Sequence, residues 1–314
     1  MDESDSEEEP HSRCIDLIIR RARVADVDGI VEIYNSSIEY LDFESREWIE
    51  SVVKKRSRRA RIYVAISDGK VVGFLLLYKK RDKAYIDAFA IDAHYRGRRI
   101  GSCLLTYVEN TLASEGVHRI FLTVKNNNHK AMNMYIKHGY KISNVVLILE
   151  ATSNSIEEYQ YIPQDITIKI DSIRRSALPK VKLLDTTLWS NFTWDIDEVL
   201  YRVSGEEATV VSVYKSGKIL GIARIYIHQD KIVVDRLAVS FYKPTEWIKI
   251  MIHVIRSRIA QENNRSIVIP VDSTKASLLK SLISLGFKVR DSEYVLHKDI
   301  TELVTALLDT IKSS

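Results

Sequence analysis

Apolar and polar residues follow one another along the first half of the chain in the order expected of a mixed α/β domain. Apolar residues at period two predict strands, and apolar residues three and four positions apart predict amphipathic helices. The expected strands lie at 17–22, 61–67, 71–79, 84–92, 118–125 and about 145–150. The expected helices lie at about 26–36, 45–58, 100–114 and 129–137. This order favours an α/β (α+β) fold in which helices flank a mixed, mostly antiparallel sheet.

The second half of the chain repeats the first. Residues 69–78 return as 217–226 and residues 87–91 return as 235–239, each 148 positions later. Two further matches, at 119–124 and 139–142, follow in the same order at an offset of 147. Paired matches at a nearly constant offset predict a tandem duplication. The predicted parts are an acidic tail at 1–16, a catalytic domain at 17–150, a linker at 151–164 and a degenerate domain at 165–314, which ends in a helix near 301–312.

Composition supports two water-soluble domains. The chain has 314 residues, of which 46% are hydrophobic and 28% are charged, and no run approaches the roughly 20 apolar residues of a membrane helix. No membrane partner is expected. The only two cysteines, Cys14 and Cys103, are far apart in sequence, so a disulfide scaffold is not expected and Cys103 is interpreted as a small buried packing residue. A reducing cytoplasmic location follows from that interpretation.

The net charge of +4 includes a short basic run. One interpretation is the solvated C-terminal end of a helix, where cations interact favourably with the dipole. The other is a surface that attracts nucleic acid or an acidic partner. The run contains no interleaved aromatic residues of the stacking kind, so the helix end is preferred and nucleic acid is not expected as a partner. The run consists of Lys54, Lys55, Arg56, Arg58, Arg59 and Arg61.

The segment 95–105 follows an expected strand and opens an expected helix. Small residues near the helix start let backbone N–H groups face outward, where the helix dipole favours an anion such as a pyrophosphate. A glycine turn that only begins a helix would have a similar sequence. The residues that make or charge this segment are Arg96, Gly97, Arg98, Arg99, Ile100, Gly101 and Ser102.

Together with the segment 128–140, this loop resembles the signature of the GNAT superfamily of acyl-CoA-dependent N-acetyltransferases. Arg96 and Gly101 match the first half of that signature, whereas Arg99 stands where the family usually has glycine. The second half is matched by Asn128, Ala131, Tyr135, Gly139 and Tyr140. The resemblance covers residues 17–150 and includes the order of the expected strands and helices.

The resemblance implies that acetyl-CoA is the co-substrate. The backbone of Phe89, Ala90 and Ile91 would pair with its pantetheine arm, and the N–H groups of residues 96–102 would hold its pyrophosphate. Asn128 would contact the cofactor near the reacting end. Tyr135 would be the general acid that protonates the departing thiolate.

The general base is open between two interpretations. Asp87 lies on the strand at which related enzymes present an acidic group to the acceptor amine, and a protonated amine must lose a proton before it attacks. Alternatively, Asp87 pairs with a neighbouring arginine and only orients the sheet, since Asp235 occupies the equivalent position of the second copy. Histidines near the motif lack metal-ligand spacing, so no metal is expected.

The second copy lacks the same chemistry. At a constant offset, residues 96–101 correspond to 244–249, which contain neither glycine nor arginine, while Asn128 becomes Lys275 and Tyr135 becomes Leu282. We therefore expect an N-acetyltransferase with one active domain, acting on a primary amine of a small molecule or a protein. The acceptor would approach the loop at 36–47, which carries Glu39, Asp42 and Glu44. The alternative is a non-enzymatic acyl-CoA-binding regulatory module that uses the basic run.

Overall fold

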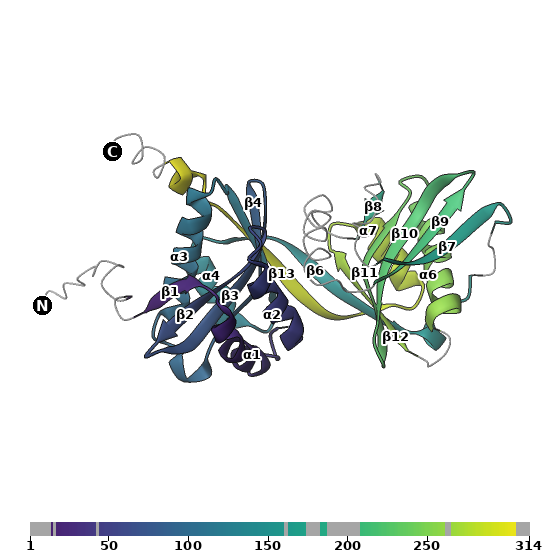
Figure 1. The fold of residues 1–314 in the computed structure, drawn as a ribbon. Coiled ribbons are helices and arrows are strands. Elements are labelled where there is room, and N and C mark those ends of the chain that lie inside the picture. The colour runs from purple at the N-terminus through teal and green to yellow at the C-terminus, as the bar shows by residue number, and fades with distance from the viewer. Residues whose placement is uncertain are drawn as a thin grey trace, which may run out of the picture. The chain divides into compact units, whose positions relative to one another are not determined.

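The computed structural model describes residue 14 and residues 17–41, 44–159, 163–173, 183–186, 208–260 and 265–305. These residues form two compact units (Figure 1), whose strands follow one another in a single hydrogen-bonded order. Within the described part of the chain, no helix has the length and hydropathy needed to cross a bilayer.

The first unit is a mixed sheet with helices packed against it (Figure 1). Neighbouring strands β1 to β4 are antiparallel, and β4 pairs in parallel with β5. The strands are β1 (Ile18–Arg21), β2 (Ala60–Ser67), β3 (Lys70–Lys80), β4 (Lys83–Ile91) and β5 (Arg119–Lys125). The helices are α1 (Val27–Asn35), α2 (Arg46–Lys55), α3 (Ile100–Ser114) and α4 (His129–Lys137). The predicted mixed, mostly antiparallel sheet with flanking helices is confirmed.

Local sequence explains where these elements begin and end. The Ser45 side chain accepts the N–H of Trp48 and caps α2, which satisfies one of the amides that a helix start leaves unpaired. Helix α2 ends at Arg56, which adopts a left-handed conformation with φ 44°. The turn between β2 and β3 places Asp68 and Gly69 at φ 49° and 74°, the two positive values that a tight hairpin requires.

The second unit repeats this pairing. Leu75↔Phe89 and Gly73↔Ile91 join β3 to β4, and the same pairs recur exactly 148 residues later as Ala223↔Leu237 and Gly221↔Val239. The strands are β7 (Ile166–Ile173), β8 (Leu184–Asp185), β9 (Ala208–Lys215), β10 (Lys218–Ile227), β11 (Lys231–Val239) and β12 (Ser266–Asp272). The helices are α6 (Pro244–Ile255), continued by a π-helical turn at Arg256–Ala260, and α7 (Ala276–Ser284). The predicted helix at 301–312 is described only for residues 301–305, which are helical.

The last strand of each copy does not stay with its own copy. Strand β6 (Lys141–Thr152) pairs with β12 over seven residues, and its residues from Ile142 onward belong to the second unit. Strand β13 (Lys288–Asp299) belongs to the first unit from His297 onward. Ile300, which follows the end of the strand, donates its N–H to the carbonyl of His118 at 2.8 Å. The expected domain limits of 17–150 and 165–314 therefore need correction at both strands. Sequence order did not reveal the exchange, because either sheet edge can accept a strand.

The two cysteines also differ from expectation. Cys14 and Cys103 form a disulfide, with their Cα atoms 6.1 Å apart, a separation that a disulfide spans readily. Cys103 is buried in the first turn of α3 as expected, but it is not a free thiol. The error came from distance along the chain, which does not limit distance in space once β1 has paired with β2. The pairing removes the reason for placing the protein in a reducing compartment.

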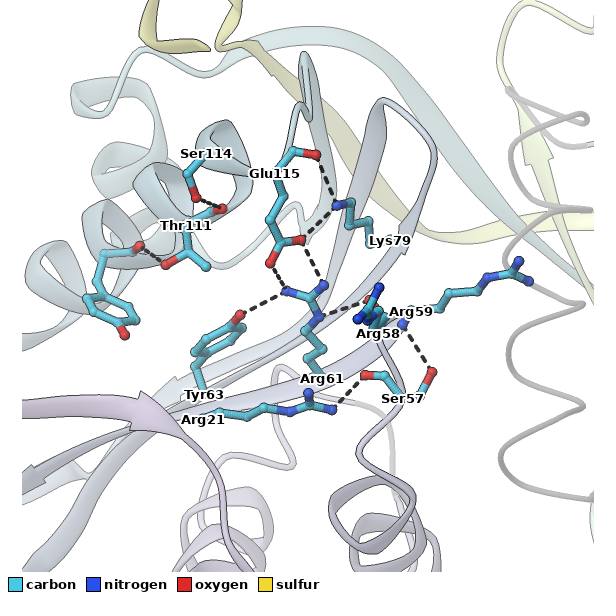
Figure 2. Close-up of polar contacts among 11 residues, drawn as sticks. Arg21, Ser57, Arg58, Arg59, Arg61, Tyr63, Lys79, Thr111, Ser114 and Glu115 are labelled. Atoms are coloured by element: carbon cyan, nitrogen blue, oxygen red, sulfur yellow. Dashed lines mark hydrogen bonds and ion pairs between the residues drawn. The ribbon is translucent and has the colours of Figure 1, made fainter. Parts of the chain in front are cut away.

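The basic run divides between a helix end and a buried ion pair. Lys54 and Lys55 lie exposed in the last turn of α2, as the helix-end interpretation requires. Arg61 instead is buried near the start of β2, where its two terminal nitrogens donate to the two carboxylate oxygens of Glu115 at 2.6 and 2.7 Å (Figure 2). Lys79 donates to the same carboxylate at 2.7 Å. One carboxylate at the end of α3 thus neutralises two cations of the sheet.

This cluster predicts a loss of stability in acid. Burial alone would raise the pKa of Glu115, but the hydrogen bonds from Arg61 and Lys79 outweigh it and lower the pKa to about 2. A depressed folded-state pKa stabilises the protein above the unfolded value near 4.5 and loses that contribution as the pH falls toward 2. With Glu115 partly exposed, we expect Glu115→Gln to cost about 2 kcal/mol of unfolding free energy at pH 7.

Urea titrations of the parent chain and of Glu115→Gln between pH 7 and pH 2 test this expectation, with Glu47→Gln on the surface of α2 as the control. The difference between parent and Glu115→Gln should shrink progressively below about pH 5. A difference that does not change over this range would show that the carboxylate charge contributes nothing.

Candidate functional site

The site begins where β4 and β5 separate. Their parallel pairing runs from Lys83↔Arg119 to Ile86↔Leu122 and then stops. At the same place the register of β4 against β3 shifts, so that Leu77 faces Ile86 and Leu76 faces Ala88. Asp87 is therefore the extra residue of a β-bulge, a feature that redirects a side chain and ends strand pairing.

Beyond the bulge, one edge of β4 is hydrogen-bonded to β3, and the other edge pairs with no strand of the described residues. Phe89, Ala90 and Ile91 pair with β3, and among the described residues no strand pairs with them on the other side. Phe89 and Ile91 are half-buried, whereas Ala90 faces the interior. The three residues that are predicted to bind the pantetheine arm thus lie along one strand edge that no described strand occupies.

That edge leads into the loop Asp92–Arg99 and the start of α3. Arg96 donates from Nε to the carbonyl of Ile91 at 2.9 Å, and Asp92 accepts the N–H of His94 at 2.8 Å. The first helical bond of α3 runs from the N–H of Cys103 to the carbonyl of Arg99. The N–H groups of residues 100–102 consequently have no partner within the helix and form its positive end.

The loop conformation explains the two unusual positions of the motif. Gly97 adopts φ 79°, and a side chain added there would meet nothing within 4 Å, so the loop surface is open at this point. Arg99 adopts φ 61°, the left-handed conformation that glycine takes easily and that costs other residues about 1 kcal/mol. Arg99 therefore takes a backbone conformation that glycine favours, and the side chains of Arg96, Arg98 and Arg99 are exposed in the loop that precedes the helix.

Gly101 is the point at which the loop motif meets α4. A side chain at this position would lie 3.3 Å from Sδ of Met134 and 3.6 Å from side-chain atoms of both Phe89 and Ile91. The absence of a side chain lets α3, α4 and β4 approach one another. Ile100 contributes only backbone to the helix start, because its own side chain is buried, while Ser102 is half-buried.

Tyr135 lies one residue beyond this contact on α4. Its ring packs 6.3 Å from the ring of Phe89 and 5.5 Å from that of Tyr140, measured between centroids. Burial raises the pKa of Tyr135 well above its usual value, so the hydroxyl keeps its proton at neutral pH. The predicted general acid and the predicted arm-binding strand are therefore neighbours.

Asn128 has a structural role at the start of α4. It is the N-cap of α4, and its Oδ1 accepts the N–H of Ala131 at 3.2 Å. Its side-chain NH₂ group is the part that remains available for a ligand. Asn128 therefore fixes the start of the helix that carries Tyr135, and its contact with the cofactor stays a prediction.

The surroundings of the aspartate at the bulge, Asp87 or Asp235, differ between the two copies. Asp235 in the second copy forms a bidentate pair with the buried Arg224. The residue equivalent to Arg224 in the first copy is Leu76, so this ion pair has no counterpart there. Asp87 is exposed, and its charge, after burial, contributes to raising the pKa of the buried Tyr78. Asp87 thus lacks this particular arginine partner, and both of its interpretations stay predictions.

Sequence reasoning missed a buried ion pair behind Tyr135. Lys298, supplied by β13, donates to Oε2 of Glu109 on α3 at 2.7 Å, and their side chains are 19% and 4% exposed. The ammonium group also lies 5.7 Å from the ring centre of Tyr140, which in turn packs on Tyr135. A glutamate in the leucine-rich part of the α3 sequence was the available indication of this pair.

The second unit has a shorter loop at this place. Eight residues, 92–99, connect β4 to α3, whereas four residues, 240–243, connect β11 to α6. Lys243 and Arg99 are both left-handed residues that precede their helices. The correspondence of 96–101 with 244–249 at a constant offset was therefore wrong, because four residues of the loop are missing.

Among the described residues, no group of His, Cys, Asp or Glu side chains is arranged to hold a metal.

Comparison with known proteins identifies similar sequences and folds. The profile of the Acetyltransferase (GNAT) family matches residues 27–140. The chain is 23% identical over 141 residues to a spermidine N(1)-acetyltransferase of Thermoplasma acidophilum, covering 40% of this chain and 88% of the relative. It is 28% identical over 124 residues to a Bacillus subtilis protein named as a candidate alanine N-acetyltransferase of ribosomal protein bS18, covering 38% of this chain and 78% of that protein.

Two solved structures share the fold over both units. A tandem GNAT protein from the clavulanic acid biosynthesis pathway superposes with a TM-score of 0.67 at 11% identity, over 90% of this chain and 98% of the other. A GCN5-related N-acetyltransferase from Sphaerobacter thermophilus gives a TM-score of 0.56 at 13% identity, over 90% and 96%. Residues 27–140 thus form an acetyltransferase domain of the GNAT family, in a chain that has the tandem form of that fold.

Proposed function

We propose that the first unit transfers the acetyl group of acetyl-CoA to a primary amine and that it holds the only coenzyme site of the chain. One observation carries this proposal: the available edge of β4 at Phe89–Ile91 leads directly to the helix start at 100–102 and passes beside Tyr135. This arrangement provides a protonated hydroxyl, hydrogen bonds for an extended amide chain and a positive helix end for phosphates.

The coenzyme would bind mainly to backbone groups. The N–H and C=O groups of Phe89 and Ile91 would pair with the amides of the pantetheine arm as a strand does. The pyrophosphate would accept from the N–H groups between Arg96 and Ser102, where the helix dipole adds to the charge of three arginines. The NH₂ group of Asn128 is placed on the same helix as Tyr135 and would donate near the thioester.

The reaction would proceed by direct attack in a ternary complex. The neutral amine nitrogen forms a bond to the acetyl carbon, and the carbon–sulfur bond breaks as the sulfur takes a proton from Oη of Tyr135. The proton that the nitrogen loses on becoming an amide then restores the Tyr135 hydroxyl. A backbone N–H at the separation of β4 and β5 would stabilise the oxyanion. Asp87, directly or through a water molecule, would accept the proton that the ammonium form of the acceptor must lose before attack.

The acceptor would be a cationic amine that approaches Asp87. One relative is named for acetylation of spermidine, and the other is named as a candidate for acetylation of an alanine of a ribosomal protein, so both small molecules and protein termini belong in the test. Glu44 also lies close enough for its charge to raise the pKa of Tyr78, which adds negative charge on this side of β4. Glu39 lies exposed after α1, and Asp42 lies outside the described residues.

A turnover screen with acetyl-CoA tests the proposed function. The panel comprises polyamines, amino acids, aminoglycosides and peptides with free termini or lysines, with thiol release as the readout. Turnover with at least one amine class is expected. Coenzyme binding without turnover across the panel would favour the non-enzymatic binding module instead.

The variant Asp87→Asn tests the base. We expect kcat/KM to fall about 100-fold at pH 7 and to approach that of the parent chain as the pH rises, because the amine then loses its proton in solution. The control is Asp82→Asn, in the exposed turn before the opposite end of β4. A deficit that does not change with pH would assign Asp87 to the structure of the bulge.

A further inference from the structure

The second unit has the same separation of strands as the first. Strands β11 and β12 pair in parallel from Lys231↔Ser266 to Val233↔Val268 and then stop. A register shift follows in the pairing of β10 with β11, as it does between β3 and β4. The edge of β11 at Leu237–Val239 is thus the counterpart of the edge at Phe89–Ile91.

In the second unit this edge is occupied by the chain itself. Residues 184–186, which we call the inserted segment, run antiparallel to β11 with Leu184 opposite Val239. Thr186 donates its N–H to the carbonyl of Leu237 at 2.9 Å and accepts the N–H of Leu237 at Oγ1 at 3.2 Å. On the other wall, its carbonyl accepts the N–H of Asp272 from the end of β12 at 2.8 Å. The inserted segment therefore bonds to both separated strands.

Burial holds the inserted segment in place. Thr186 is fully buried, and Leu184 packs against the main core of the second unit. The preceding residue, Leu183, packs on a smaller cluster that includes Ile222 and Ala238. Buried polar groups with their hydrogen bonds satisfied are costly to expose, so a competing ligand would have to replace these bonds and these apolar contacts together.

We propose that the inserted segment is an internal ligand, which occupies in the second unit the place that the coenzyme's pantetheine arm takes in the first. A peptide strand and a pantetheine arm present similar amide groups to a strand edge, so the same edge can accept either one. The second unit is then closed to acyl-CoA by its own backbone as well as by its shortened loop. The comparison with the first unit rests on the proposed function, whereas the occupancy of the second cleft is independent of it.

Hydrogen exchange on the full chain tests this inference residue by residue. Without ligand, the amide of Leu237 should exchange at least tenfold more slowly than that of Phe89, its counterpart 148 residues earlier. Addition of CoA should slow exchange at residues 89–91 and leave residues 237–239 unchanged. Fast exchange at Leu237 in the free protein, or slowing there by CoA, would overturn the proposal.

A conservative variant removes one bond of the inserted segment. Thr186→Val keeps the shape of the side chain and loses the acceptor for the Leu237 amide, so exchange at Leu237 should accelerate about fivefold. Thr209→Val on β9 is the matched control and should leave that amide unchanged. An unaltered rate in Thr186→Val would contradict the assigned contact. If CoA protects neither unit while Leu237 stays protected, the proposed function fails and the internal ligand remains supported.

Discussion

Tyr135→Phe is expected to lower kcat by a factor of about 100 to 10,000, the range typical of removing a general acid, while CoA binds with nearly unchanged affinity. The variant keeps the aromatic ring, so the packing on Phe89 and Tyr140 at 6.3 and 5.5 Å is retained. Only the hydroxyl that would protonate the thiolate is lost. Initial rates with the best acceptor of the screen, together with calorimetric titration of CoA, separate the two effects.

The proposed role of Tyr135 as general acid also predicts how the rate depends on the leaving thiol. A thiol of lower pKa is a better leaving group and needs the donated proton less, so acetyl thioesters of more acidic thiols should narrow the gap between Tyr135→Phe and the parent chain. Tyr107→Phe, an exposed tyrosine on α3, is the control and should behave as the parent chain does. Equal turnover in Tyr135→Phe would show that the thiolate departs without this donor.

Lys298→Met is expected to lower the free energy of unfolding by about 3–5 kcal/mol, the usual cost of leaving a buried charge without its partner. Glu109 is only 4% exposed, and Lys298 is 2.7 Å from one of its oxygens. The other oxygen, Oε1, is buried and has no hydrogen-bond partner among the described residues. Methionine preserves the length of the lysine stem, so lost packing contributes little to the effect.

The pair can be separated from general damage by a double variant. Glu109→Gln combined with Lys298→Met removes both charges and should recover most of the loss, because no uncompensated charge stays buried. Lys288→Met, exposed on the same strand, is the matched control. Thermal and urea unfolding of the full chain measure the parent, both single variants, the double variant and the control. A double variant that is less stable than either single variant would rule out the pairing as the cause.

The Glu109–Lys298 pair also connects the end of the chain to the interior of the first unit. Its strand β13 delivers Lys298 to the first unit, where the ammonium group lies against Tyr140 and Tyr140 packs on Tyr135. The first unit therefore needs a residue from the end of the chain to complete its interior. A chain that ends before β13 would leave Glu109 buried without its cation.

The sequence by itself was sufficient for the local structure, and it named the candidate residues of the motif. Helices α3 and α4 begin and end at the predicted residues, because apolar periodicity, the Asn128 cap and the glycine at position 139 are all encoded within a few residues of each other. The repeat predicted equivalent strands, and the pairs Leu75↔Phe89 and Ala223↔Leu237 confirm that register. The family resemblance then indicated the loop at 96–102 and Tyr135 as parts of the candidate site.

Only the tertiary structure decided which distant segments meet. The exchange of β6 and β13, the disulfide between Cys14 and Cys103, the Glu109–Lys298 pair and the inserted segment at 184–186 all join residues that are far apart in sequence. A strand edge bonds through its backbone, which is the same for every residue type, so the sequence of an edge does not name its partner. Which strand, segment or ligand occupies each edge depends on how the whole chain buries its apolar surface and satisfies its buried polar groups.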